Sequence, residues 1–152
     1  MDIAVVKIEL SFSVHATEDI EKNMETISKL IPQNNFDHAN IKQEKLEGGY
    51  GNPIEFLQIT FTRKKEMDNI IANLASNLDV SEKKKLNSEF HERFNKEKST
   101  FFFRFAKESL YKNKFQISSS TNVIKVALKM RSFVKNVDFR KYMIDRGILL
   151  EE

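Results

Sequence analysis

Residues 15 to 19, His-Ala-Thr-Glu-Asp, place a histidine close to two carboxylates, the side chains that general acid–base catalysis uses most often. A carboxylate could orient the imidazole of His15 for proton transfer, and a hydrolase of this kind would need a concave pocket here. The same stretch also suits a helix start, because the Thr17 hydroxyl can cap a helix and Glu18 and Asp19 are favourable in its first turn. The helix start is the simpler interpretation, so we expect no catalytic residue here.

Metal and nucleotide sites find no support in the sequence. The three histidines at positions 15, 38 and 91 lack metal-ligand spacing, and the chain contains no cysteine. The glycine-rich segment EGGYGNPI, residues 47 to 54, lacks the lysine and hydroxyl of a phosphate-binding loop, and it precedes a strand instead of opening a helix. It predicts a tight turn with Tyr50 at its tip, where the ring could stack on an RNA base. We therefore expect no metal and no cofactor.

The strongest functional signal is a basic strand near residue 127. Apolar residues fill the even positions from 124 to 130, whereas Lys125, Lys129 and Arg131 fill odd positions. This alternation predicts a strand with one buried face and one basic face. A row of cations on a sheet can follow a phosphate backbone, which favours RNA binding. The alternative is that these lysines only keep an exposed strand soluble and unpaired.

The charge of the chain is unevenly distributed. Residues 1–95 carry 12 Lys and Arg against 16 Asp and Glu, whereas residues 96–141 carry 12 against 3, a net charge of +9. A basic segment of this size is typical of a polyanion-binding protein, although solvated lysines can also cluster by chance. Arg104, Lys107 and Lys114 lie in this segment, and we expect them to flank the basic strand.

A run of phenylalanines, TFFFRF at residues 100 to 105, gives a second hypothesis. Most of these rings should be buried, but alternation sends some of them to the opposite face. An exposed ring beside Arg104 would be either a base-stacking platform or a dimer contact. An adaptor protein that dimerises through Phe101 or Phe103 is therefore the alternative to RNA binding.

The elements that must position these residues form an α+β pattern. Residues 6–14 alternate as a strand, residues 41–47 suggest a short strand, and residues 54–62 suggest a strand whose change of parity implies a bulge or burial on both faces. Helical spacing appears at residues 20–31, at 67–78 and after Ser81, and Asp138 begins a closing helix. Residues 100–131 suggest three strands with turns between them.

We therefore expect one domain, residues 1–152, with a mostly antiparallel or mixed sheet and helices packed on one side. The longest apolar runs are shorter than a membrane-spanning helix needs, and the N-terminus lacks a signal-peptide pattern. A chain without cysteine suits a reducing cytoplasm.

Three segments give the chain a family resemblance, namely SFSVHATEDIEKNMETISKLIP, EGGYGNPIEFLQITF and FFFRFAKESLYKNKFQISSSTNVIKVALKM. In this order they resemble an archaeal RNA-binding-domain family over residues 5 to 131. The resemblance implies a protein associated with the exosome or with ribosomal components, and a fold similar to the large-subunit ribosomal protein that holds 5S RNA. The positions that match the family's more specific marks are Thr17, Glu18, Asp19, Gly51, Asn52 and Pro53, and Arg104 and Lys107 match its arginine and lysine. Ala106 and Glu108 depart from the aspartate and glutamine expected there, and Asn113 or a neighbour replaces a glycine expected in the following turn.

Overall fold

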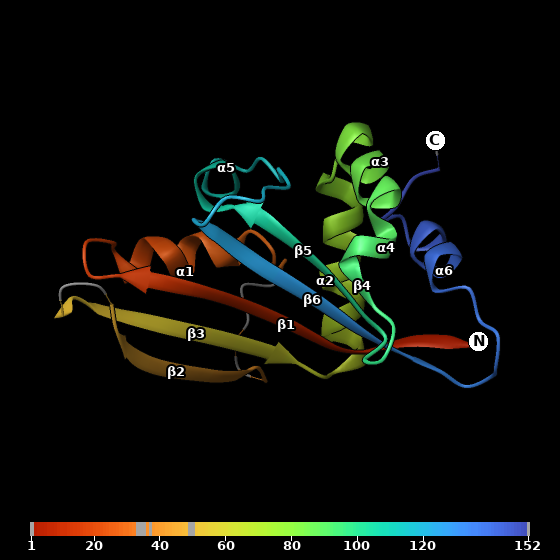
Figure 1. The fold of residues 1–152 in the computed structure, drawn as a ribbon, viewed down its shortest axis with the longest axis horizontal. Helices are drawn as coiled ribbons and strands as arrows, with labels where there is room; N and C mark the ends of the chain where they lie inside the picture. Colours follow the sequence, from red (N-terminus) through yellow and green to blue (C-terminus); the bar gives the residue numbers. More distant parts are fainter. Residues whose placement is uncertain (1, 33–35, 37, 49–50, 152) are drawn as a thin grey trace.

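The computed structural model describes residues 2–32, 36, 38–48 and 51–151, and within them the chain forms one six-stranded sheet. The strand order is β2-β3-β1-β6-β5-β4, and each neighbouring pair is antiparallel (Figure 1). The strands are β1 Ile3–His15, β2 Asn40–Glu47, β3 Pro53–Phe61, β4 Phe94–Asn95, β5 Thr100–Ala106 and β6 Val123–Ser132. The predicted α+β class and the antiparallel sheet are confirmed.

The two alternating segments of the sequence lie side by side as the central strands β1 and β6. A bulge between Val5 and Lys7 shifts their register, so that Val5 pairs with Met130 and Lys7 pairs with Lys129. The one extra residue keeps the apolar side chains on one face and the charged side chains on the other. Strands β1, β3, β5 and β6 bury one face each, and their fully buried side chains include Ile8, Leu10, Ile59, Phe61, Phe101, Phe103, Phe105, Ile124, Val126 and Leu128.

Six helices of the described residues complete the fold, and their apolar sides pack on this buried face of the sheet. They are α1 Ile20–Ser28, α2 Lys64–Asn77, α3 Val80–Ser88, α4 Phe90–Arg93, α5 Lys107–Tyr111 and α6 Phe139–Asp145. Figure 1 shows α1 beside α5 near one end of the sheet, and α2, α3, α4 and α6 grouped toward the other. Within the part of the chain that the structure describes, no helix is long and apolar enough to cross a membrane.

The helix caps correct two details of the sequence analysis. Asp19, and not Thr17, caps α1, because its carboxylate accepts the backbone N–H of Glu21 at 2.9 Å. In the same way Asp79, and not Ser81, caps α3. Asp138 caps α6 as predicted. Asp, Ser and Thr side chains can all accept the free N–H groups of a first helical turn. Where a Ser or Thr lies beside an aspartate, the sequence alone therefore does not show which residue caps the helix.

Two further expectations about the strands are corrected. Strand β3 contains no register shift against either neighbour, so its change of parity places Leu57 and Ile59 on the helix side and Phe56 on the opposite face. Residues 107–111 form the short helix α5, and Ile117 makes an isolated bridge to Phe105 where a third strand was expected. A helix of five residues is too short to show a helical stripe.

The phenylalanines of β5 exclude one form of the adaptor hypothesis. Phe101 and Phe103 are both 0% exposed, and their rings pack in the core with centroids 5.8 Å apart and an interplanar angle of 49°. Phe102 lies between them in sequence and therefore points to the opposite face. A subunit interface built from Phe101 or Phe103 is wrong, because these rings are the centre of the hydrophobic core.

Gly48 fixes the connection between β2 and β3. Its N–H donates to the Asn52 carbonyl at 2.7 Å, and an added Cβ would lie 2.8 Å from that carbonyl oxygen and 2.7 Å from Ile54 Cδ1. Gly48→Ala should therefore lower the free energy of unfolding by about 1 to 2 kcal/mol. Urea denaturation measures this loss. Gly51→Asn is the control, since Asn tolerates the positive φ of Gly51 (+74°) and its Cβ meets open space there. An equal loss of stability in both variants would show that the close contacts of Gly48 are not the cause.

Candidate nucleic-acid interface

The face of the sheet opposite the helices, here named the open face, carries rows of paired side chains. In the described structure no helix packs on it. One row runs Ser11, Lys125 and Arg104 across β1, β6 and β5. The neighbouring rows are Glu9, Ala127 and Phe102, and then Lys7, Lys129 and Thr100. The strand order therefore places side chains from distant parts of the sequence next to one another.

The predicted basic strand face exists as a surface. Lys125, Lys129 and Arg131 lie on the open face, with Lys129 and Arg131 exposed and Lys125 half-buried. Arg104 pairs with Lys125 on the neighbouring strand. Partial burial, together with the positive charges of Arg104 and Lys98, lowers the pKa of Lys125 below its ordinary value, against the opposing effect of Glu9. Arg104 and Lys98 are therefore near enough for their charges to act on the Lys125 ammonium, so positive charge is concentrated on this surface.

A hollow of about 640 Å³ extends this positive surface beside the β1 bulge. Lys7, Lys98, Lys129 and Arg131 line it, with Glu97 as its acidic neighbour. We name the cations of the open face and this hollow the basic face, and its members are Lys7, Lys98, Arg104, Lys125, Lys129 and Arg131. The arrangement suits a phosphate backbone, which binds cations spaced along a strand.

Sequence reasoning missed two members of the basic face. Lys7 alternates correctly with the core residues of β1, but only the pairing of β1 with β6 places it opposite Lys129. Lys98 lies in the loop before β5 and approaches the sheet through the backbone bond from Met130 N–H to the Ser99 carbonyl, 2.9 Å long. The polar alternation of residues 7, 9, 11 and 13 was the available signal for Lys7.

Phe102 is the aromatic member of the open face. The Lys125 Nζ atom lies 4.4 Å from the centre of its ring, a cation–π distance, and the ring remains half-exposed. Its neighbour across the sheet is Ala127, whose methyl group rises little above the strand. Phe102 is therefore the ring beside Arg104 for which the sequence allowed either a stacking platform or a dimer contact.

Two of the predicted site residues, Lys107 and Lys114, do not join the basic face. Lys107 begins α5 with only 6% of its surface exposed, and its ammonium group donates to Glu18 Oε2 at 3.1 Å and to the Ser13 carbonyl. Lys114 is exposed, but it lines a cleft with Asp79 on the helix side. Tyr50 lies outside the described residues. Lys107 is thus a buried partner of Glu18, a role that its place in a basic segment did not indicate.

A second hollow, of about 550 Å³, opens at the junction of β1 and α1. His15 and Glu18 line it, but the Glu18 carboxylate accepts the backbone N–H of His15 at 3.1 Å. This bond does not involve the imidazole ring. Burial raises the pKa of Glu18, whereas the His15 N–H bond and the Lys107 ammonium lower it by more, so the net pKa lies below its ordinary value near 4.5. The pocket that a hydrolase would need is present, without the oriented histidine–carboxylate pair.

Two proteins of similar sequence are known from archaea. One is the RNA-binding protein PAB1135 of Pyrococcus abyssi, which is 29% identical over 128 residues, or 83% of this chain and 82% of that protein. The other is the uncharacterised protein MJ0213 of Methanocaldococcus jannaschii, 30% identical over 130 residues, or 83% of this chain and 85% of that one.

The fold is also similar to that of a solved structure. The protein AF2318 from Archaeoglobus fulgidus, of the family DUF54, shares 27% identity with a TM-score of 0.72, and the alignment covers 93% of this chain and 96% of that one. The turn after α5, where the family resemblance leads us to expect glycine, holds Asn113 at φ +66°, a conformation that asparagine tolerates better than most residues. The family model described as RNA binding matches residues 7–130, and the chain therefore belongs to this RNA-binding family.

Proposed function

We propose that the chain is a non-catalytic protein that binds single-stranded RNA on its basic face. The observation that carries this proposal is that Phe102 and the six cations of the basic face share one uncovered surface of the sheet. Splayed bases can stack on an aromatic ring of a flat sheet while cations contact the phosphates between them. Membership of an RNA-binding family, and similarity to the RNA-binding protein PAB1135 of Pyrococcus abyssi, support the same ligand.

The electrostatic part of this proposal predicts a strong dependence on salt. Each phosphate that a cation neutralises releases condensed counterions, so the slope of log affinity against log salt falls by roughly 0.7 for each contact to a single strand. A fluorescence anisotropy titration of a labelled single strand at several salt concentrations measures this slope. Affinity that does not change with salt would contradict the proposal.

Phe102→Ala should weaken binding of single-stranded RNA by about 1 to 2 kcal/mol and leave the salt slope unchanged, because the variant removes a stacking surface and no charge. Anisotropy titrations at two salt concentrations separate these effects. Phe133→Ala is a control that removes another exposed ring, because Phe133 is 62% exposed and follows the last residue of β6. Equal losses in the two variants would show that Phe102 has no special role.

The family resemblance supports a role in RNA processing linked to the exosome or to ribosomal components, and a chain without cysteine suits the cytoplasm. RNA that is crosslinked to the chain in cells can be sequenced to identify its targets. Incubation of end-labelled RNA with the chain should leave the length of the RNA unchanged, and the appearance of shorter products would contradict the non-catalytic assignment.

A further inference from the structure

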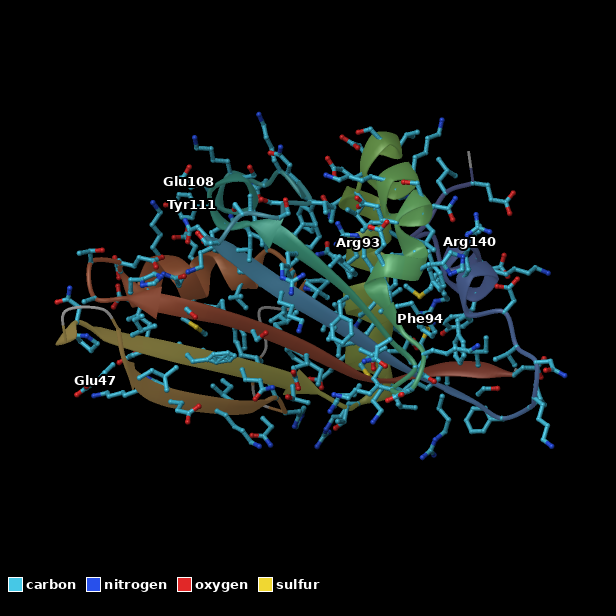
Figure 2. All side chains as sticks on the ribbon, in the orientation of Figure 1. Glu47, Arg93, Phe94, Glu108, Tyr111 and Arg140 are labelled. Carbon is cyan, nitrogen blue, oxygen red and sulfur yellow. The ribbon has the colours of Figure 1, made fainter. Side chains whose placement is uncertain are left out.

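Strand β2 forms one outer edge of the sheet. Its only strand neighbour within the described residues is β3, and every residue from Asn40 to Glu47 is exposed. Figure 1 shows β2 beyond β3 along the margin of the molecule, and Figure 2 shows Glu47 at the outer end of β2. An edge strand presents a row of backbone N–H and C=O groups that can pair with a further strand.

Strand β2 also exposes two apolar side chains to water. Ile41 and Leu46 are each 45% exposed. Ile41 pairs with the buried Ile59 and so lies on the helix side, whereas Leu46 pairs with Ile54 on the open face. A strand added beside β2 would cover part of both side chains, because neighbouring strands lie only about 5 Å apart.

The sequence of β2 is complementary to itself. When two copies of β2 run antiparallel with the two Gln43 residues opposite each other, Lys42 of each copy lies opposite Glu44 of the other. Both pairs lie on the open face, because the even-numbered residues of β2 point there. A slip of two residues is the smallest that keeps each side chain on its own face, and it places either Lys42 against Lys42 or Glu44 against Glu44. The charges therefore favour one register, with a second copy of this chain as the partner.

The other side chains of β2 are compatible with this register. Gln43 lies on the two-fold axis, and its Nε2 donates one N–H to Glu55 Oε2 at 2.8 Å. An amide nitrogen has two N–H groups, so the second can donate to the amide oxygen of the other copy. Lys45 lies opposite Ile41 of the other copy, where its alkyl stem covers the apolar side chain. Lysines on an edge strand can prevent pairing, but here each lysine faces either Glu44 or Ile41.

We propose that two copies of this chain associate through their β2 strands, as an antiparallel pair that joins the two six-stranded sheets into one. Backbone hydrogen bonds supply the affinity, and the side-chain pairs fix the register. The two-fold axis is perpendicular to the sheet, so the two open faces form one continuous surface. The contact is one strand wide, and the dimer is therefore weak and depends on concentration. It does not require RNA, so it stands independently of the proposed function.

The first test is the oligomeric state of the full chain and of two charge variants. Analytical ultracentrifugation up to about 1 mM should show a monomer–dimer equilibrium for the wild type. Glu44→Lys places Lys42 of each copy opposite a second lysine, and Lys42→Glu places Glu44 opposite a second glutamate. Each variant should dimerise on the order of tenfold more weakly than the wild type, because two attractive pairs become repulsive.

An equimolar mixture of the two variants is the control for their folding. In the mixed dimer both repulsive pairs become attractive again, so the mixture should dimerise as tightly as the wild type. A mixture no tighter than either variant alone would overturn the proposal, as would equal affinities in the wild type and both variants. A wild type that stays monomeric up to about 1 mM would also overturn it, and would leave the β2 edge to a strand of a different protein or to no partner.

The register is tested by a spin label. The chain contains no cysteine, so Asn40→Cys gives a single site for a nitroxide. This labelled chain is mixed with ¹⁵N-labelled wild type, whose signals then report only contacts between copies. The amide signal of Leu46 should broaden most strongly, because it lies opposite residue 40 of the other copy, and the amides of β4 at the far edge of the sheet should stay sharp. Broadening centred outside β2 would contradict the proposed contact.

Discussion

Reversal of three charges on β6, by Lys125→Glu, Lys129→Glu and Arg131→Glu, should weaken binding of single-stranded RNA by on the order of 100-fold. Each lost attraction to a phosphate accounts for about 1 kcal/mol in a solvated site, and three together give about 3 kcal/mol. The three residues point away from the core, so the variant should fold. Anisotropy titrations measure the affinity, and the slope of log affinity against log salt should become shallower by roughly 2 units.

A matched variant tests whether position or net charge causes this loss. Lys83, Lys84 and Lys85 lie on α3, on the helix side of the sheet, and are at least partly exposed. Their reversal to glutamate changes the net charge by the same amount. We expect this control to bind RNA within about threefold of the wild type, because its charges lie in the helix layer and not on the basic face, and salt screens charges that do not contact the RNA. Equal losses of affinity in both variants would show that RNA binding depends on the net charge of the chain and not on the basic face.

The second large effect concerns the ion pair between Glu18 and Lys107, which joins α1 to α5. Lys107 has 8% of its side chain exposed and Glu18 has 25%, with 3.1 Å between Nζ and Oε2. Glu18→Leu leaves a buried ammonium group without its anion, and should lower the free energy of unfolding by about 3 kcal/mol. Lys107→Met should have a smaller effect, about 2 kcal/mol, because water can still reach the Glu18 carboxylate. Urea denaturation of each variant measures these losses.

The double variant shows whether the pair itself causes the loss. Glu18→Leu with Lys107→Met leaves no unpaired buried charge, so its loss should be about 1 to 2 kcal/mol smaller than the sum of the single losses. Strict additivity would show that the two side chains act independently.

The Glu18 pair also predicts a dependence on pH. The folded-state pKa of Glu18 is below its ordinary value near 4.5, so its contribution to stability is present above that value and disappears as the pH falls through the folded pKa. The difference in stability between the wild type and Glu18→Leu should therefore narrow in acid. Denaturation at neutral pH and at successively more acidic values measures this, and a difference that widens in acid would contradict it.

The fold was predictable where one sequence pattern was strong. The alternation of β6 placed Ile124, Val126 and Leu128 in the core and Lys125 and Lys129 on the other side, as the structure shows. Helix α2 followed from its apolar stripe. The short helix α5 was not predicted, since five residues are too few for a stripe. Strand β2 was predicted at residues 41–47, although it has no buried face.

The site was predictable only in part, because it depends on which strands are neighbours. Lys125, Lys129 and Arg131 belong to one strand, so periodicity alone identified their common face. Lys7 joins them only through the pairing of β1 with β6, which residues more than a hundred positions apart create. The burial of Lys107 depends likewise on Glu18, 89 residues earlier. Packing determines the contacts between distant segments, and local sequence patterns do not predict those contacts.

The central claim is that RNA lies on the open face, and alanine methyl groups test it most directly. Ala127 pairs with Phe102 in the middle of this face, whereas Ala72 is exposed on α2 in the helix layer. The chain is labelled at its alanine methyl groups and titrated with a short single-stranded RNA. We predict that the Ala127 signal shifts in proportion to binding while the Ala72 signal stays in place. A shift at Ala72 with none at Ala127 would contradict RNA binding on the open face.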